Sequence, residues 1–173
     1  DAKDTTITAK FVDINKLPDP GFDTLAVSVL CGENTTQNGW TTTAGGKIRV
    51  LDGLNFFTHQ KERNGDAYKP YSDERVLGLN TVKSTGTYYT INVEKSKNYT
   101  LNLKWVLTLV DGYVSSDVPV DSVLKKVAIG DTTKTSVLDE GMLVSVENLR
   151  ATANWENLTL NFNSGDNEEL RVF

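Results

Sequence analysis

Residues 87–111, TYYTINVEKSKNYTLNLKWVLTLVD, carry the clearest pattern in the chain. Apolar and polar side chains alternate over two runs, which the polar stretch Lys95-Ser96-Lys97-Asn98 separates. Successive side chains of a β-strand point to opposite faces, so each run has one apolar and one polar face. Only Val106 interrupts the second run. A short polar connection between two such runs predicts an antiparallel hairpin with one face on a core and the other toward water.

Shorter alternating runs lie on both sides of this hairpin. The sequence predicts strands over residues 4–12, 24–31, 47–51, 74–82, 141–147, 155–163 and 170–173, with 54–58 as the return partner of 47–51. Turns rich in Gly, Asn and Asp separate these runs, and residues 32–46 and 59–72 are typical of long loops. One segment departs from the pattern, because its apolar residues fall at i, i+3, i+4 and i+7. That spacing predicts a short helix carrying Val120, Val123, Leu124 and Val127.

Many short strands and at most one short helix predict an all-β fold. We expect an antiparallel β-sandwich of the immunoglobulin-like or jelly-roll type. The chain has 173 residues and shows neither an internal repeat nor a dividing linker. The expected organisation is therefore an N-terminal strand arm over residues 1–12 and one sandwich domain over residues 13–173.

Composition and charge exclude several classes of protein. Hydrophobic residues make up 38% and charged residues 24% of the chain, which is not the composition of a disordered segment. The net charge of −5 argues against nucleic acid and anionic membranes as partners, since both require clustered Lys and Arg, but it admits cations such as calcium. Cys31 is the only cysteine, so no internal disulfide forms. No apolar run is long enough to span a bilayer.

Two features bear on the compartment. The chain begins at Asp1 rather than Met, which we interpret as a secreted, extracellular protein whose leader has been removed; a trimmed piece of a longer chain is the alternative. Acceptor sequons for N-glycosylation begin at Asn34, Asn98 and Asn157, although a chain rich in Asn and Thr produces such triplets by chance.

The sequence shows no catalytic constellation, so we expect the protein not to be an enzyme. His59 is the only histidine, and a histidine-based triad or metal site needs partners that are not apparent in the sequence. Phosphate-binding loops, Rossmann glycine patterns and CxxC pairs are absent from the sequence. We expect no cofactor, with calcium as the one exception. The weak calcium candidates are Asp166 and Glu168, in an oxygen-rich turn without the spacing of an EF-hand loop.

Trp40 is the tryptophan that we expect to be exposed. It follows the turn signal Asn38-Gly39 in a Thr-rich loop. An exposed indole can stack on a sugar ring, and packing under the edge of the loop is the alternative interpretation.

The N-terminal run alternates Ile7, Ala9 and Phe11 with polar residues. A strand near a terminus can pair within its own sheet or add to the open sheet edge of a neighbour. The run KDTTITAKFVD, residues 3–13, resembles the N-terminal donor strand of major pilins of the colonization-factor, alternate chaperone–usher class. This resemblance implies that Ile7, Ala9 and Phe11 would be donated to the next copy of the chain. The first strand of a closed sandwich is the alternative.

These observations lead to three functional hypotheses. The first is a non-catalytic extracellular structural subunit that assembles with copies of itself into a filament, pilus or tube by strand donation. The second is a secreted or cell-surface carbohydrate-binding or adhesin module that binds a glycan through Trp40 and the two long loops. The third is a virion tail-tube or decoration protein. Neither nucleic acid nor a membrane span has a part in any of them.

Overall fold

The computed structural model describes residues 16–17, 28–32, 35–43, 46–52, 75–81, 86–105, 125–149 and 156–173. Among these residues there is no helix, and every paired strand is antiparallel. The strands are β1 (Ser28–Cys31), β2 (Thr36–Gln37), β3 (Trp40–Thr42), β4 (Gly46–Asp52), β5 (Arg75–Thr81), β6 (Thr87–Asn92), β7 (Asn98–Trp105), β8 (Lys125–Gly130), β9 (Val144–Leu149), β10 (Glu156–Asn163) and β11 (Glu169–Val172). The predicted all-β class is confirmed.

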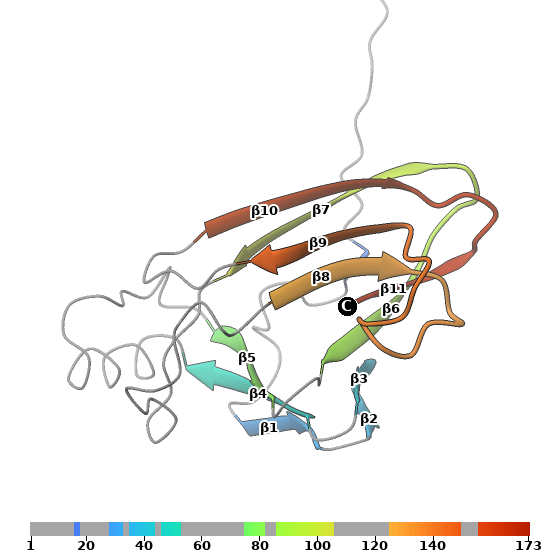
Figure 1. The fold of residues 1–173 in the computed structure, drawn as a ribbon. Helices are drawn as coiled ribbons and strands as arrows, with labels where there is room; N and C mark the ends of the chain where they lie inside the picture. Colours follow the sequence, from blue (N-terminus) through green and yellow to red (C-terminus); the bar gives the residue numbers. More distant parts are fainter. Residues whose placement is uncertain are drawn as a thin grey trace, which may run out of the picture.

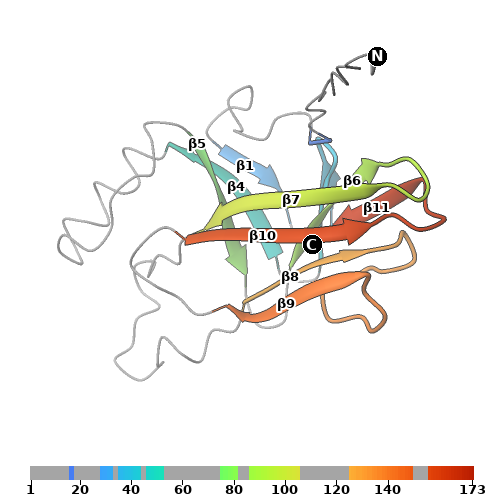
Figure 2. The same cartoon turned by 90° about the horizontal axis from the view of Figure 1, so that it is seen from above.

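The strands form three sheets. A six-stranded sheet has the order β2-β3-β6-β11-β8-β9, β7 pairs with β10, and β1, β4 and β5 form the third sheet. The β7–β10 pair lies over the six-stranded sheet as a second layer (Figure 1). Seen from above, the β1–β4–β5 sheet lies away from the turns that leave β6 and β10 (Figure 2). The arrangement is an antiparallel β-sandwich, as the sequence predicts.

The core lies between the β7–β10 pair and the six-stranded sheet. Its buried members come from both layers: Ile91, Val93, Ile129, Phe162 and Leu170. Partly buried side chains pack around them, and the rings of Tyr99 and Phe162 stack with their centroids 5.8 Å apart. Alternating apolar side chains on each strand supply this layer, which is the face that the sequence pattern marks as apolar.

The predicted hairpin is wrong, although both of its strands exist. β6 pairs with β3 and β11, and β7 pairs with β10, so the two runs belong to different layers. Their apolar faces meet across the core instead of lying side by side. Alternation fixes which face of a strand is buried but does not specify the neighbouring strand, so the same pattern suits both arrangements.

The connection between β6 and β7 is held by the turn after β10. The hydroxyl of Ser164, which is fully buried, accepts a hydrogen bond from the Lys97 N–H at 3.0 Å and donates one to the Glu94 carbonyl at 2.6 Å. The Ser96 N–H donates to the Gly165 carbonyl at 2.6 Å, and the Ser164 N–H to the Lys97 carbonyl at 2.9 Å. The backbone N–H and C=O groups of the β6–β7 connection thus find hydrogen-bond partners in the turn after β10. β6 and β7 therefore need not pair with each other and can lie in different layers.

The predicted short helix is also wrong where the structure describes it. Val127 lies in β8, between β11 and β9, and residues 120–124 lie outside the described residues. Within β8, Val127 and Ile129 follow a two-residue period, and Ala128 and Ile129 are both fully buried. β-Branched residues favour a strand, and β8 has a paired strand on each side. These two effects outweigh the helical spacing of the four apolar residues.

The predicted loop over residues 32–46 contains a small hairpin. β2 and β3 pair around Asn38 and Gly39, whose φ angles are +51° and +81°. A two-residue hairpin turn of this kind requires positive φ at both positions, which Asn-Gly supplies. A side chain at Gly39 would also collide with the Tyr89 ring, because its Cβ would lie 2.4 Å from a ring carbon.

Several predicted segments lie outside the described residues. They include the strand over residues 4–12, the return strand over 54–58 and the whole loop over 59–72. The described partners of β4 are β1 and β5, and β5 falls within the predicted strand over 74–82.

A segment that we call the strap, residues 131–143, covers part of the outer face of the six-stranded sheet. Arg171 on β11 donates a hydrogen bond to the Lys134 carbonyl of the strap, and its guanidinium lies 4.4 Å from the Tyr88 ring centroid. A Cβ at Gly130 would lie 2.7 Å from the Met142 sulfur, so a larger residue there would force this side chain of the strap to move.

Two aspartates cap turns within the strap. Asp131 accepts hydrogen bonds from the Thr133 hydroxyl and from its backbone N–H, the latter at 2.8 Å. Asp139 accepts them from the Thr135 and Ser136 N–H groups at 2.7 and 3.0 Å. The Thr133 hydroxyl is the largest cause that lowers the pKa of Asp131, and the Thr135 N–H is the largest that lowers the pKa of Asp139.

Removal of the Ser164 hydroxyl should destabilise the whole sandwich. Ser164→Ala leaves the Lys97 N–H and the Glu94 carbonyl without this partner, which costs about 1–3 kcal/mol for buried groups. Urea unfolding should show this loss, whereas Ser145→Ala at an exposed position of β9 should change the free energy of unfolding by less than about 0.5 kcal/mol. Equal effects of the two substitutions would contradict the role assigned to Ser164.

Acid should loosen the strap. The folded-state pKa of Asp139 is below its ordinary value of 3.8, so its contribution to stability is fully present above that pH and is lost as the pH falls through the folded value. Between pH 5 and pH 3 the unfolding midpoint should therefore fall more for the wild type than for Asp139→Asn, whose side chain cannot ionise. Glu140→Gln removes a charge next to it without touching these caps and should behave as the wild type. A steeper fall in Asp139→Asn than in the wild type would reverse the assignment.

Candidate functional site

The outer face of the β7–β10 pair is a row of exposed polar side chains. The register opposes Asn98 with Asn163, Thr100 with Asn161, Asn102 with Thr159 and Lys104 with Asn157. All eight of these side chains are exposed, and we call them the ladder. Seven of the eight are uncharged amides or hydroxyls, in a chain whose net charge is −5.

Cross-strand hydrogen bonds tie three of the four opposed pairs together. The Thr100 hydroxyl donates to Asn161 Oδ1 at 2.8 Å, and the Thr159 hydroxyl donates to Asn102 Oδ1 at 2.9 Å. At the end of the row, Asn163 Nδ2 donates to Asn98 Oδ1 at 2.8 Å. These bonds fix the rotamers of both partners before any ligand arrives.

The bonds leave hydrogen-bonding capacity on the surface. Each amide NH₂ has two N–H donors and each hydroxyl oxygen has two lone pairs, so one cross-strand bond does not exhaust them. Asn102 and Asn161 keep their amide donors, and the oxygens of Thr100 and Thr159 can still accept. Apart from Lys104, the ladder therefore presents uncharged donors and acceptors, an arrangement suited to binding and not to proton transfer.

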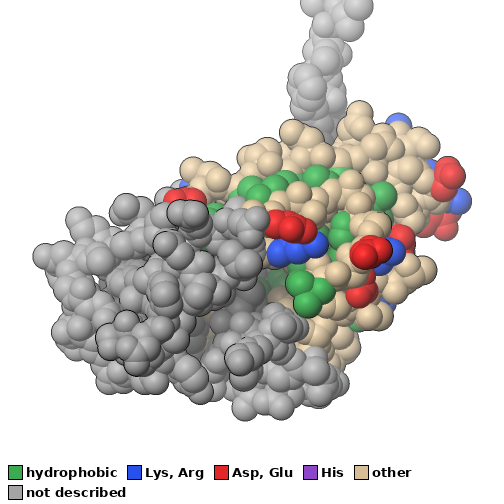
Figure 3. All heavy atoms as spheres, in the orientation of Figure 1, with side chains coloured by type: hydrophobic (Ala, Val, Ile, Leu, Met, Phe, Trp, Pro, Cys, Tyr) green, Lys and Arg blue, Asp and Glu red, His purple; other side chains and the backbone are tan. Residues whose placement is uncertain are grey.

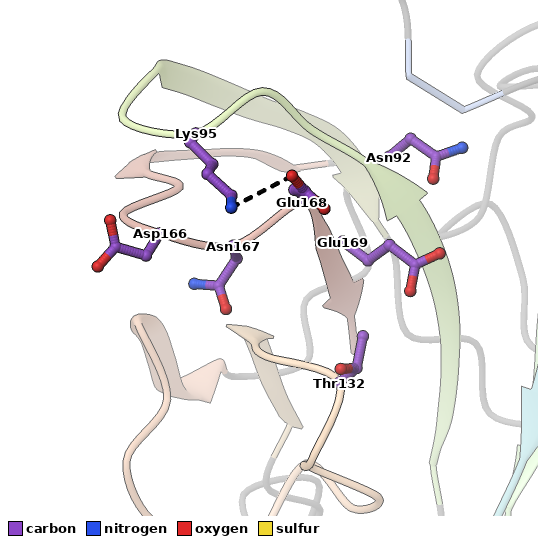
Figure 4. Close-up of a pocket in the computed structure, with 7 residues that line it drawn as sticks. All are labelled: Asn92, Lys95, Thr132, Asp166, Asn167, Glu168 and Glu169. Atoms are coloured by element: carbon purple, nitrogen blue, oxygen red, sulfur yellow. Dashed lines mark ion pairs between the residues drawn. The ribbon is translucent and has the colours of Figure 1, made fainter.

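A polar hollow of about 470 Å³ lies at one end of the molecule, beside the turns after β6 and β10 (Figure 4). It is lined by Asn92, Lys95, Thr132, Asp166, Asn167, Glu168 and Glu169. The Lys95 ammonium lies 3.2 Å from the Glu168 carboxylate, and both side chains are largely exposed. Asn163 joins the ladder to this end, because its Oδ1 accepts a hydrogen bond from the Gly165 N–H at 2.8 Å.

The two calcium candidates do not converge. Glu168 points toward Lys95, whereas the carboxylate of Asp166 points away from that pair (Figure 4). Within the described part of the chain, no group of three or more His, Cys, Asp and Glu side chains is placed to hold a metal ion. Calcium binding by Asp166 and Glu168 stays a prediction without support from this geometry.

Trp40 lies at the edge of the core. Its side chain is only partly exposed, and its ring meets the ring of Tyr89 edge-on, with centroids 5.3 Å apart and planes at 66°. This is the edge packing that the sequence analysis kept as the alternative to a sugar-stacking platform. Trp40 does not belong to the ladder, which lies on β7 and β10.

The proposed donor side chains Ile7, Ala9 and Phe11 lie outside the described residues. The structure does describe Lys16 and Leu17, which follow that arm. The Lys16 ammonium is 5.8 Å from the Tyr99 ring centroid, and Leu17 packs against the core cluster. The chain after the arm is thus anchored beside the first residues of β7.

The sequence analysis did not identify the ladder as a site. The polar positions of both strands were assigned to a water-facing surface, but β7 was paired with β6 instead of β10. The signal that was present is the repetition of Asn and Thr at alternate positions in both 98–102 and 157–163.

The described residues contain no helix with the length and apolar character needed to cross a membrane.

Figure 3 shows uncharged surface along the upper edge, over β7 and β10, with charged side chains gathered nearer its ends.

Comparison with known proteins gives a likeness in fold alone. No protein-family model matches the chain, and no curated protein matches it. Among solved structures, the chain is similar to Fisc, a Stig cyclase from Fischerella sp. TAU, determined in complex with (3Z)-3-(1-methyl-2-pyrrolidinylidene)-3H-indole. The TM-score is 0.52 at 13% sequence identity, over 90% of this chain and 84% of that chain. At this identity the likeness supports the all-β sandwich of this chain and does not extend to activity.

Proposed function

We propose that the chain is a non-catalytic, secreted or cell-surface carbohydrate-binding module, and that the ladder is its binding face. The observation that carries the proposal is the set of exposed amides and hydroxyls on β7 and β10, tied in pairs by cross-strand bonds. A sugar hydroxyl donates and accepts hydrogen bonds, as do the free groups of the ladder. Binding a neutral sugar to such a face does not require the desolvation of a buried charge.

Fixed side chains lower the cost of binding. Three of the four ladder pairs are already held in one arrangement, so less side-chain entropy is lost when a ligand is bound. The ladder carries no aromatic side chain, so stacking on a sugar ring does not add to the affinity. Four hydrogen bonds at about 1 kcal/mol each correspond to a dissociation constant of about 1 mM for one site. Display of several copies on one support would raise the apparent affinity.

Replacement of the two ladder hydroxyls should reduce glycan binding. Thr100→Val with Thr159→Val removes both hydroxyls and keeps the β-branched shape that suits a strand. We expect binding of a tetramerised chain to a broad glycan array to fall about tenfold or more, because two hydrogen bonds of about 1 kcal/mol each are lost.

A matched control exists on another sheet. Thr36 and Thr41 form an exposed cross-strand hydroxyl pair at 2.8 Å on β2 and β3, and Thr36→Val with Thr41→Val should leave binding unchanged. Full binding by the ladder variant, or loss of binding in Trp40→Ala when that variant remains folded, would move the site away from the ladder. No bound glycan on the array would overturn the proposal.

A structural subunit that assembles by strand donation is the second candidate. It is favoured by the position of Lys16 and Leu17 beside β7, together with the pairing of β7 with β10 alone among the described strands. A strand edge of this kind can accept a strand from another copy, and Ile7, Ala9 and Phe11 would be the donated side chains. No feature of the described residues favours the virion protein, which stays a prediction of the sequence analysis.

Deletion of residues 1–12 tests this second candidate. The full chain at high concentration should form filaments in negative-stain electron microscopy, and the shortened chain should remain dispersed. Circular dichroism should show the same β-rich spectrum for both, because the described core begins at Leu17. Filaments of the shortened chain would exclude strand donation, and a dispersed full chain would leave the binding module as the better account.

A further inference from the structure

The two strands of the ladder share a short sequence motif. Residues 98–103 read NYTLNL and residues 157–162 read NLTLNF, so Asn, Thr, Leu and Asn recur in the same order, with an apolar residue at the other two positions. In both strands the Asn and Thr side chains are exposed, whereas the apolar side chains are buried or partly buried. The same motif therefore supplies the outer face of both strands.

The register places the two copies of the motif around a local two-fold axis. Leu101 opposes Leu160, which is the same residue of the motif, at the centre of the pairing. Because the strands are antiparallel, a half-turn about the midpoint of this pair, with the axis normal to the sheet, exchanges β7 with β10. It brings Thr100 onto the position of Thr159, and the asparagine two residues further along each strand onto that of the other. The centre of the ladder thus consists of two equal halves.

The hydrogen bonds follow the same symmetry. The Thr100 hydroxyl donates to Asn161 Oδ1 at 2.8 Å, and the Thr159 hydroxyl donates to Asn102 Oδ1 at 2.9 Å. We call these two pairs the half-sites. In each half-site the amide N–H groups and a lone pair of the hydroxyl oxygen can bond a sugar hydroxyl. The half-sites lie about 7 Å apart along the strands, since each residue of a strand adds about 3.4 Å.

The ends of the row depart from this symmetry. At one end Asn163 donates a hydrogen bond to Asn98, and at the other end Lys104 takes the position that corresponds to Asn163. The residues that precede the two motifs also differ, since they are Lys97 and Glu156. A ligand can therefore meet an asymmetric surface only if it is long enough to reach beyond the half-sites.

We infer, on the basis of the function proposed above, that the ladder binds disaccharides in two opposite directions with equal affinity. A disaccharide has a reducing and a non-reducing end, and a half-turn about the axis normal to the sheet reverses their order. Every contact that the ligand makes with the two half-sites in one direction is available to it in the other. The ligand class is a hydroxyl-rich disaccharide unit that is recognised by its hydroxyls and not by the order of its ends.

Paramagnetic labelling tests this inference. A nitroxide is attached as a glycoside to the reducing end of maltose, cellobiose, lactose and β-1,4-mannobiose, and amide signals of the ¹⁵N-labelled chain are recorded with the nitroxide oxidised and reduced. Broadening of Asn98 and Asn163 places the label at one end of the row, and broadening of Lys104 and Asn157 places it at the other. For every disaccharide that binds, we expect broadening at both ends that differs less than about twofold, after subtraction of the effect of the free nitroxide.

Two single variants test whether the half-sites are equivalent. Thr100→Val and Thr159→Val each remove one hydroxyl and keep the β-branched shape, so both should weaken binding of the same unlabelled disaccharide by about fivefold. If the label favours one end of the row in the first variant, it should favour the opposite end in the second. Thr36→Val removes an exposed hydroxyl on β2 and should change neither measurement.

The outcomes distinguish the inference from the function on which it rests. Broadening that differs by about twofold or more between the two ends in the unaltered chain would overturn the inference and leave glycan binding intact. The same end favoured in both variants, or losses of affinity that differ by about twofold or more, would also overturn it. Absence of binding by all four disaccharides would overturn the inference alone if the glycan array shows binding, and the glycan-binding proposal as well if the array shows none.

Discussion

The hydroxyl of Ser164 is the constraint on which the two layers depend. It lies fully buried between two turns, accepts from the Lys97 N–H and donates to the Glu94 carbonyl. These bonds hold the end of β6 and the start of β7 against the turn that follows β10. Because the polar groups of the connection are satisfied there, β6 continues into one layer and β7 into the other. The apolar faces of both strands then enclose Ile91, Phe162 and their neighbours.

The two layers expose their outer faces differently. The strap crosses the outer face of the six-stranded sheet, is held by the hydrogen bond from Arg171, and packs its Met142 side chain close to Gly130. The outer face of β7 and β10 carries exposed side chains along its whole length. The ladder is therefore the regular, polar and exposed surface that is open to a ligand. The comparison with Fisc supports the sandwich and adds nothing about this surface, because the likeness is one of fold.

Local pattern predicted the strands better than their partners. The alternations over 87–93, 99–105 and 155–163 predicted β6, β7 and β10 because a period of two residues is a local property. Pairing depends on contacts between distant residues, and neither the buried Ser164 nor the opposition of Thr100 to Asn161 can be read from one segment alone. The ladder was missed for the same reason. The helical spacing that ends at Val127 gave a wrong prediction of a helix. β8 is covered on both faces, so its apolar residues do not alternate strictly.

The ladder also contains the asparagines of two acceptor sequons. Asn98-Tyr99-Thr100 and Asn157-Leu158-Thr159 place their asparagines on the exposed side of β7 and β10. In a eukaryotic secretory pathway an attached oligosaccharide would cover the same amides and hydroxyls that a free glycan would contact. The host in which the protein is made would then decide whether this face is available, since a bacterial cytoplasm that attaches no such oligosaccharide leaves it bare. The two residue types that make the ladder neutral are also the two that a glycosylating host recognises.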